Sequence, residues 1–217
     1  MNITVAQTLE MPNAVLFARE LEAALKAEQE KRKRFYEMID EDRKMEFING
    51  EIYFQSPAKY CHTQAVTNLS GLMLAYVRAN QLGVVATEKM LISLSRNDYE
   101  PDLCFFRNEK AITFAKDQMQ FPAPDLVVEV LSESTEKRDR GVKFEDYAAH
   151  GISEYWIIDP DTEIIEQYEL VEGDYELLLK ANEGILKSVV VENFAVPIRA
   201  IFDGDLIAET LKKLVAG

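Results

Sequence analysis

Cysteine and histidine are scarce in this chain, whose 217 residues include only two of each. Cys61 and Cys104 do not make a disulfide framework. Their settings, beside His62 and within an apolar segment, are typical of reduced thiols. So few cysteines and histidines also argue against a structural zinc site. We therefore expect a cytoplasmic protein.

Long apolar runs and nucleotide-binding motifs are absent as well. No stretch approaches the length of a transmembrane helix, so we expect no membrane span. The N-terminus lacks a basic leader followed by a hydrophobic core, which argues against a secretory signal. The chain contains neither a GxGxxG motif nor phosphate-loop spacing, so the sequence gives no sign of the common nucleotide-binding sites.

Basic residues are outnumbered, with 24 Lys and Arg against 38 Asp and Glu and a net charge of −14. Such a charge argues against broad, nonspecific attraction to nucleic acid. The basic run EKRKR at 30–34 is typical of a solvated helical face. Any nucleic-acid partner would have to be bound by the local field of one face.

The order of predicted elements indicates an α/β protein in which helices pack against a sheet. We expect a helical extension over residues 1–40 and a single domain over 41–217. Helical spacing or helix-forming composition predicts helices at 14–38, 62–81, 139–151 and the C-terminal end. We expect strands at 83–94, 101–107, 124–132 and 154–160. Hairpins are expected at 44–57 and 162–181. The Asn49–Gly50 pair is the strongest of the turn signals.

Glu129 stands in the middle of the apolar run PDLVVEVLS, which is typical of a buried strand. An unpaired charge in such a place is unfavourable by several kcal/mol or more. Either a structural partner, such as an arginine or backbone N–H groups, satisfies this carboxylate, or a cation is bound there. Both interpretations remain open on the residues alone.

Two strands that begin with Pro-Asp bring a second carboxylate into the argument. Alternation places Asp102 with Cys104 on one face of the first strand, and Val127 with Glu129 on one face of the second. If these faces meet the same helix layer, Asp102 and Glu129 approach each other. Paired carboxylates with a backbone carbonyl are ligands that Mg²⁺ prefers, and such an ion can promote phosphodiester hydrolysis.

Lys143 lies in the basic helix that follows Glu129, with Asp139 four residues before it and Tyr147 four residues after it. The spacing alone favours a surface Asp–Lys pair, which stabilises the helix by about 0.3 kcal/mol. The functional alternative is an ammonium group delivered to the carboxylate site, where it would steady an attacking hydroxide or the phosphate.

Three segments together carry a resemblance to a known family. In order, MEFINGEIYFQSPAKYCH, PDLCFF and PDLVVEVLSESTEKRDRGVKFEDYAAHGISEYWIIDP resemble the Uma-type restriction endonuclease family, over about residues 35 to 205. Its members are assigned to the PD-(D/E)XK nuclease superfamily. The resemblance implies a restriction-endonuclease-like core of helix, three strands, helix and strand, with an added N-terminal helix and β-hairpins.

The resemblance also implies site residues. Asp102 occupies the position of the acidic metal ligand, and Glu129 that of the acidic residue of the tripeptide, with the Val130 carbonyl as a further metal ligand. The tripeptide here ends in Leu131 and lacks its lysine, so Lys143, on the next helix, becomes the candidate catalytic lysine.

Accessory roles near the metal are implied for Glu46, Glu51 and His62. From the residues alone, the first two suit the surface of a hairpin, and His62 suits the start of a helix as well as a ligand.

These implications define the expected function and its alternatives. We expect an endonuclease that depends on Mg²⁺ (or Mn²⁺), hydrolyses phosphodiester bonds in DNA and acts as a homodimer. The alternatives are a noncatalytic nuclease-fold module that binds nucleic acid or a protein, and an oligomeric interaction protein. A thiol nucleophile at Cys61 beside His62 has little support, because sequence neighbours rarely present their side chains to one another.

Overall fold

The computed structural model describes residues 4–40 and 43–216, and the chain divides into two compact units, Met1–Gln55 and Ser56–Gly217. The domain boundary predicted near residue 40 stays a prediction. Among the described residues, no helix is long and apolar enough to cross a membrane.

In its described residues, 4–40 and 43–55, the first unit contains two helices and a hairpin. Helix α1 spans Val5–Leu9 and α2 spans Ala14–Met38, so the helix predicted over 14–38 is confirmed. Strands β1 (Met45–Ile48) and β2 (Glu51–Phe54) pair antiparallel around the predicted turn. Asn49 and Gly50 have φ of 52° and 82°, the left-handed backbone that a two-residue hairpin turn requires.

The second unit is built on a six-stranded sheet of order β11-β10-β9-β8-β6-β3. Its strands are β3 (Gly83–Thr87), β6 (Leu103–Arg107), β8 (Leu126–Val130), β9 (Glu154–Asp159), β10 (Ile164–Val171) and β11 (Asp174–Ala181). The central pair β8–β9 is parallel, and every other pair in the sheet is antiparallel. A parallel pair needs a crossover connection, and helices α5 and α6 lie in it.

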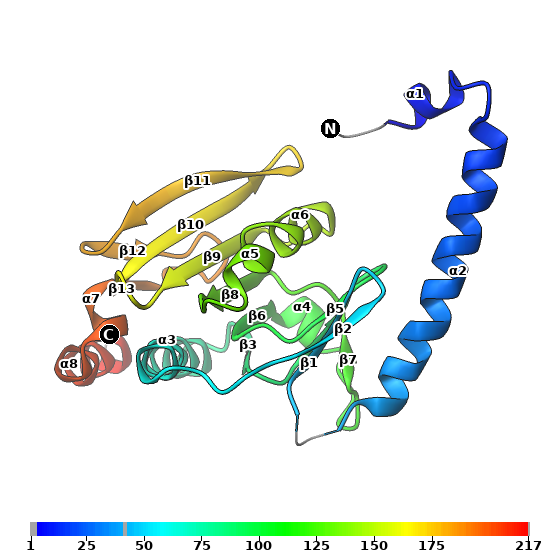
Figure 1. Ribbon diagram of the computed structural model, residues 1–217. Helices are drawn as coiled ribbons and strands as arrows, with labels where there is room; N and C mark the ends of the chain where they lie inside the picture. Colours follow the sequence, from blue (N-terminus) through cyan, green and yellow to red (C-terminus); the bar gives the residue numbers. More distant parts are fainter. Residues whose placement is uncertain (1–3, 41–42, 217) are drawn as a thin grey trace. The chain divides into compact units, whose positions relative to one another are not determined.

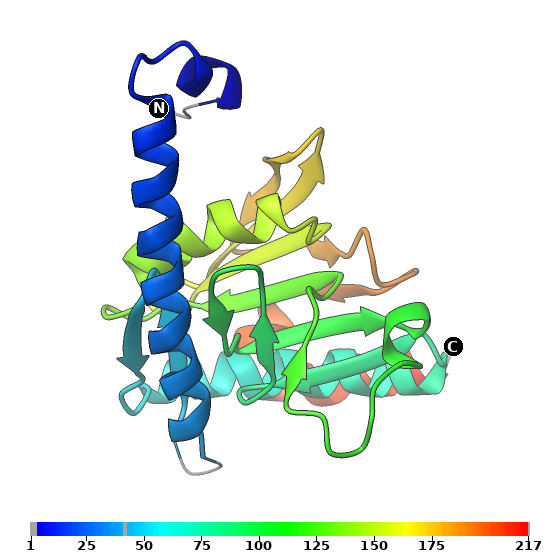
Figure 2. The same ribbon diagram turned by 90° about the vertical axis from the view of Figure 1, so that its right-hand side faces the viewer.

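Helices cover both faces of this sheet (Figure 1 and Figure 2). On one face the core is formed by α3 (Tyr60–Ala79), α7 (Arg199–Phe202) and α8 (Gly204–Ala216) together with alternate residues of the strands, such as Leu103 and Val128. On the other face lie α5 (Glu136–Asp139) and α6 (Val142–Ala149), where Phe144 stacks edge-on against Tyr155, Tyr168 and Tyr175.

The remaining elements are short. They are β4 (Leu91–Ser93), β5 (Asp98–Tyr99), α4 (Asn108–Ala111), β7 (Gln120–Phe121), β12 (Ile185–Lys187) and β13 (Ala195–Pro197). Strand β4 pairs with β5 and β7, and β12 pairs with β13. The segment 83–94 is thus two strands, because the chain turns out of the main sheet after Thr87.

The order α3, β3, β6, β8, α5–α6, β9 is the predicted core of helix, three strands, helix and strand. The helix expected over 139–151 differs in detail, since it is divided at Gly141. A Cβ atom at this glycine would lie 2.8 Å from the carbonyl oxygen of Lys137, closer than real Cβ contacts. The glycine therefore permits the tight passage from α5 to α6.

Candidate functional site

Strands β6 and β8 bring the two predicted acidic residues to the same end of the sheet. They pair antiparallel with Leu103 opposite Val128, so Asp102 precedes the paired segment on one strand and Glu129 follows it on the other. Oδ2 of Asp102 accepts a hydrogen bond of 2.8 Å from the N–H of Val130. Both acidic side chains are buried.

Glu129 has two donors on helix α6. Its Oε1 accepts hydrogen bonds from Nζ of Lys143 at 3.0 Å and from the hydroxyl of Tyr147 at 2.8 Å. Tyr147 follows Lys143 by one helical turn, so both side chains reach the same carboxylate. The buried Glu129 is thus charge-paired by a lysine.

Lys143 also lies 3.1 Å from Oδ1 of Asp139, at the i,i+4 spacing that the sequence indicated. The surface interpretation of this pair is wrong, because the two residues are each only 1% exposed. A buried charged pair needs excellent geometry to offset the loss of hydration. Here the carboxylates of Glu129 and Asp139 flank the ammonium group of Lys143, on the face of the sheet that α5 and α6 cover.

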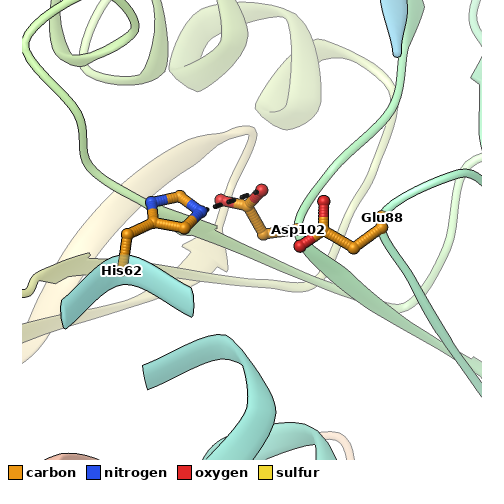
Figure 3. A group of neighbouring side chains, drawn as sticks. All are labelled: His62, Glu88 and Asp102. Atoms are coloured by element: carbon orange, nitrogen blue, oxygen red, sulfur yellow. Dashed lines mark ion pairs between the residues drawn. The ribbon is translucent and has the colours of Figure 1, made fainter. Parts of the chain in front are cut away.

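A second group of polar side chains meets at Asp102. His62, Glu88 and Asp102 each offer one ligand atom, and these atoms lie within 4.8 Å of one another. In Figure 3, Asp102 lies between the other two side chains, which point toward it. The distance of 3.7 Å between Nε2 of His62 and Oδ1 of Asp102 is too long for a hydrogen bond.

Three different elements supply this group. His62 is in the first turn of α3, Asp102 precedes β6, and Glu88 stands at the corner after β3. Glu88 has a φ of 66°, in the left-handed region that is uncommon for a residue other than glycine. Its N–H donates to the carbonyl oxygen of Asp102 at 3.2 Å, which ties the corner to the start of β6.

Two carboxylates and one imidazole are a donor set that fits a divalent cation. The pKa of His62 reflects the same surroundings. Burial lowers it, but Asp102, the Leu131 backbone and Glu88 raise it, and the result lies above the ordinary value of 6.5. The local potential that favours a proton on the imidazole also favours a metal cation.

Glu88 was missed by the sequence analysis. It lies in TEKMLIS, a segment without any recognisable motif, and no periodicity distinguishes its side chain. Only the turn between β3 and β4 brings it to Asp102. The metal-capable group of His62, Glu88 and Asp102 does not include Glu129, so the predicted ligand roles of Glu129 and the Val130 carbonyl stay predictions.

The two glutamates of the first unit differ from each other. Glu51 is exposed and lies 3.0 Å from Nζ of Lys31, as expected of a hairpin surface residue. Glu46 is fully buried, so the surface interpretation is wrong for it. The accessory roles of Glu46 and Glu51 stay predictions.

Neither cysteine is set up as a nucleophile. Burial, together with the Glu129 carboxylate, holds the pKa of the Cys104 thiol far above its ordinary value of 9.0. The Sγ atom of Cys61 lies 3.7 Å from Asp161, whereas its neighbour His62 is directed toward Asp102. Both cysteines are free thiols, as predicted.

Comparison with known proteins identifies the family. The Uma2 family, described as "Putative restriction endonuclease", matches residues 32–199, which is more than half of the chain. The chain belongs to the Uma2 family. The resemblance seen in the sequence is thereby confirmed.

Relatives of this Uma2 chain occur in cyanobacteria. The uncharacterised protein sll1609 of Synechocystis sp. (strain ATCC 27184 / PCC 6803 / Kazusa) is 33% identical over 138 residues, covering 63% of this chain and 77% of its own length. A second uncharacterised protein of that organism, slr1290, is 29% identical over 163 residues, covering 71% and 82% respectively.

The fold is shared with a solved structure. A crystal structure from Anabaena variabilis ATCC 29413, described as "a putative nuclease belonging to DUF820", has a TM-score of 0.67 at 17% identity, covering 82% of this chain and 96% of that one. At this identity the similarity establishes the fold alone. The predicted α/β, restriction-endonuclease-like fold is confirmed.

Proposed function

We propose that this Uma2 protein is a divalent-metal-dependent endonuclease that hydrolyses phosphodiester bonds in DNA. The observation that carries the proposal is the position of Asp102. Its carboxylate belongs to the metal-capable group with His62 and Glu88, and it also accepts a hydrogen bond from Val130, the residue next to Glu129. The metal-capable group is thus hydrogen-bonded to the strand that carries Glu129, and Glu129 in turn binds Lys143, which supports one site for all of these residues.

Each side chain has a role in this proposal. His62, Glu88 and Asp102 would hold a divalent ion, which would supply Lewis-acid stabilisation of a phosphodiester and activation of water. Glu129 would accept a hydrogen bond from the attacking water and so orient it. Lys143, which is buried and bound to Glu129, would fix that carboxylate and place positive charge beside the phosphate.

The acidity of the chain shapes the expected binding. With a net charge of −14, the protein as a whole repels the DNA backbone. The local field at the metal-capable group would have to overcome this repulsion. We therefore expect DNA binding that is weak, sensitive to salt and strongly dependent on the divalent ion.

A homodimer is part of the proposal, because cleavage of both strands of a duplex suits two identical sites. Strand β11 forms an edge of the main sheet, and its Leu177 and Leu178 are 52% and 47% exposed. An edge strand with exposed apolar side chains can pair with a second copy. Light scattering coupled to size exclusion would give the mass of the particle, and a monomer at micromolar concentration would refute this part.

Cleavage of supercoiled plasmid in Mg²⁺ and in Mn²⁺ tests the activity. We expect nicked or linear DNA with the wild type, and a rate at least ~100-fold lower with Asp102→Asn or Glu129→Gln. Asp125→Asn is the matched control: this residue also follows a proline before a strand, and its carboxylate also accepts a backbone N–H, that of Arg107 at 2.8 Å. Cleavage that survives both site substitutions would refute the assignment.

A noncatalytic nuclease-fold module is the second candidate. It is favoured by the contacts of Glu129, whose carboxylate is already bound by Lys143 and Tyr147. This candidate predicts DNA or protein binding without cleavage in either metal. Binding to labelled duplex with no products on varied sequences, together with unchanged binding in Glu129→Gln, would favour it over the enzyme.

A further inference from the structure

We propose that the group formed by His62, Glu88 and Asp102 selects transition-metal ions over Mg²⁺ and Ca²⁺, and that the imidazole of His62 is the source of this selectivity. The inference rests on the proposed function only in taking this group as the metal site of the enzyme. It differs from the expectation of an all-oxygen magnesium site, because the ligand group contains nitrogen.

The donor chemistry decides the class of ion. Mg²⁺ and Ca²⁺ are hard cations that take oxygen ligands, and Mg²⁺ gives up its bound waters reluctantly. An imidazole suits iron, nickel, copper and zinc, whereas carboxylates suit magnesium, calcium and manganese alike, and the affinity of a nitrogen-containing site rises from Mn²⁺ through Co²⁺ to Cu²⁺. A site with one imidazole and two carboxylates therefore gains more affinity for Mn²⁺, Co²⁺ or Zn²⁺ than for Mg²⁺.

The spacing of the ligand atoms suits a single ion. Two ligand atoms at about 2.1 Å from one ion lie roughly 3.0 to 3.4 Å apart when they are neighbours in its coordination shell. Nε2 of His62 and Oδ1 of Asp102 are 3.7 Å apart, and the three ligand atoms all lie within 4.8 Å. These separations are slightly longer than those of neighbouring ligands on one ion, so the three atoms are close enough to share a single cation.

The ligands are held in place by contacts of their own. Oδ2 of Asp102 accepts from the N–H of Val130, which fixes the carboxylate plane and directs Oδ1 toward His62. The N–H of Glu88 donates to the Asp102 carbonyl oxygen. The His62 side chain is only 13% exposed at the start of the 20-residue helix α3. For His62 and Asp102, little side-chain conformational entropy is left to lose when an ion binds.

The three ligands do not contribute in the same way. Replacing Glu88 by glutamine removes a charge but leaves an oxygen, so affinity for every divalent ion falls together. Replacing His62 by aspartate exchanges nitrogen for oxygen, which removes the preference and keeps a potential ligand. His62→Asp is thus the variant that separates selectivity from affinity.

Calorimetric titration of the full-length protein with Mg²⁺, Mn²⁺ and Co²⁺, without DNA, measures both quantities. We expect one ion per chain and wild-type affinity for Mn²⁺ and Co²⁺ at least ~10-fold above that for Mg²⁺. In His62→Asp the affinities for Mn²⁺ and Co²⁺ should lie within about threefold of the affinity for Mg²⁺. Glu88→Gln should weaken the binding of all three ions by at least ~10-fold and leave the ratios of their affinities unchanged. Circular dichroism establishes that each variant is folded.

Two residues provide matched controls. His150 is the other histidine of the chain and lies at the end of α6, outside the metal-capable group, so His150→Asp should leave the metal ratio unchanged. Glu172 is an exposed glutamate with a φ of 51°, close to that of Glu88. Glu172→Gln therefore repeats the chemical change of Glu88→Gln on a similar backbone, and metal affinity should stay as in the wild type.

The outcomes separate this inference from the proposed function. Equal or tighter binding of Mg²⁺, no binding of any of the ions, or a preference that survives His62→Asp would overturn the selectivity. A protein that binds Mn²⁺ selectively but cleaves no DNA would refute the endonuclease and leave the selectivity standing. A protein that cleaves DNA and binds Mg²⁺ as tightly as Mn²⁺ would refute the selectivity and leave the endonuclease standing.

Discussion

The ammonium group of Lys143 lies 3.0 Å from Oε1 of Glu129, and both residues are buried. The pair joins helix α6 to the central strand β8, and Asp139 completes it from the preceding helix. A single interaction thus fixes the acidic residue of the candidate site and the helix that covers it.

Removal of the Lys143 charge should destabilise the fold. In Lys143→Met the Glu129 carboxylate loses its cation in a buried place, and we expect the free energy of unfolding to fall by about 3–5 kcal/mol. Urea denaturation measures this loss. Lys137→Met, on the exposed side of α5, should change stability by less than about 0.5 kcal/mol.

The double variant Lys143→Met/Glu129→Gln separates stability from activity. Because it removes the charge of Glu129 together with that of Lys143 and leaves Asp139 as the one carboxylate of the three, it should recover at least about 1 kcal/mol of the loss. Plasmid cleavage should remain absent in it, if Glu129 and Lys143 belong to the active site. Recovery of cleavage would contradict their assigned roles.

A bound metal ion should stabilise the protein through Asp102. An ion that binds only the folded state, at ~100 times its dissociation constant, contributes about 2.7 kcal/mol. We expect Mn²⁺ to raise the melting temperature of the wild type and of Asp125→Asn by several degrees. Asp102→Asn should show no such rise, and an equal rise in all three proteins would place the ion elsewhere.

Gly141 should not tolerate a side chain. In Gly141→Ala the new Cβ would meet the Lys137 carbonyl oxygen at 2.8 Å, so the backbone between α5 and α6 has to shift. We expect a loss of about 1–3 kcal/mol, since the clash is with backbone and not with a flexible side chain. Gly204→Ala controls for the loss of a glycine, because a new Cβ there would have Nε2 of Gln64 as its nearest neighbour, at an ordinary distance of 3.8 Å. An equal loss in both variants would exclude the steric explanation.

Glu166 should make stability depend on acid pH. Burial raises the pKa of this carboxyl. The hydrogen bonds from Arg140, Lys180 and Tyr168 lower the pKa by more than burial raises it, so that it falls from 4.5 to about 2. A lowered folded-state pKa stabilises the fold above pH 4.5, and this contribution is lost as the pH falls toward 2.

The matched measurement compares the wild type with Glu166→Gln. We expect a difference in unfolding free energy of about 2–3 kcal/mol at pH 7, because the charge pairs are partly exposed on the Arg140 side. The difference should shrink steadily below pH 4.5. A difference that stays constant from pH 6 to pH 3 would contradict the pairing.

Much of the fold could be read from the sequence because local patterns fix local structure. Asn49–Gly50 specifies the hairpin turn, the apolar run around Glu129 gives strand β8, and the spacing of Lys143 and Tyr147 puts them on one face of α6. Each of these features depends on residues near one another in the chain.

Tertiary structure decided the rest of the candidate site. Helical spacing placed Lys143 beside Asp139, yet the same spacing fits a surface pair; only the packing of α6 on β8 buries it against Glu129. Glu88 carries no local signal at all, because its place beside His62 and Asp102 follows from a left-handed corner between two sheets. The sequence by itself determined which side chains share a face of one element. Which elements meet was decided by the burial of apolar surface across the whole unit, and that burial brings distant charges into contact.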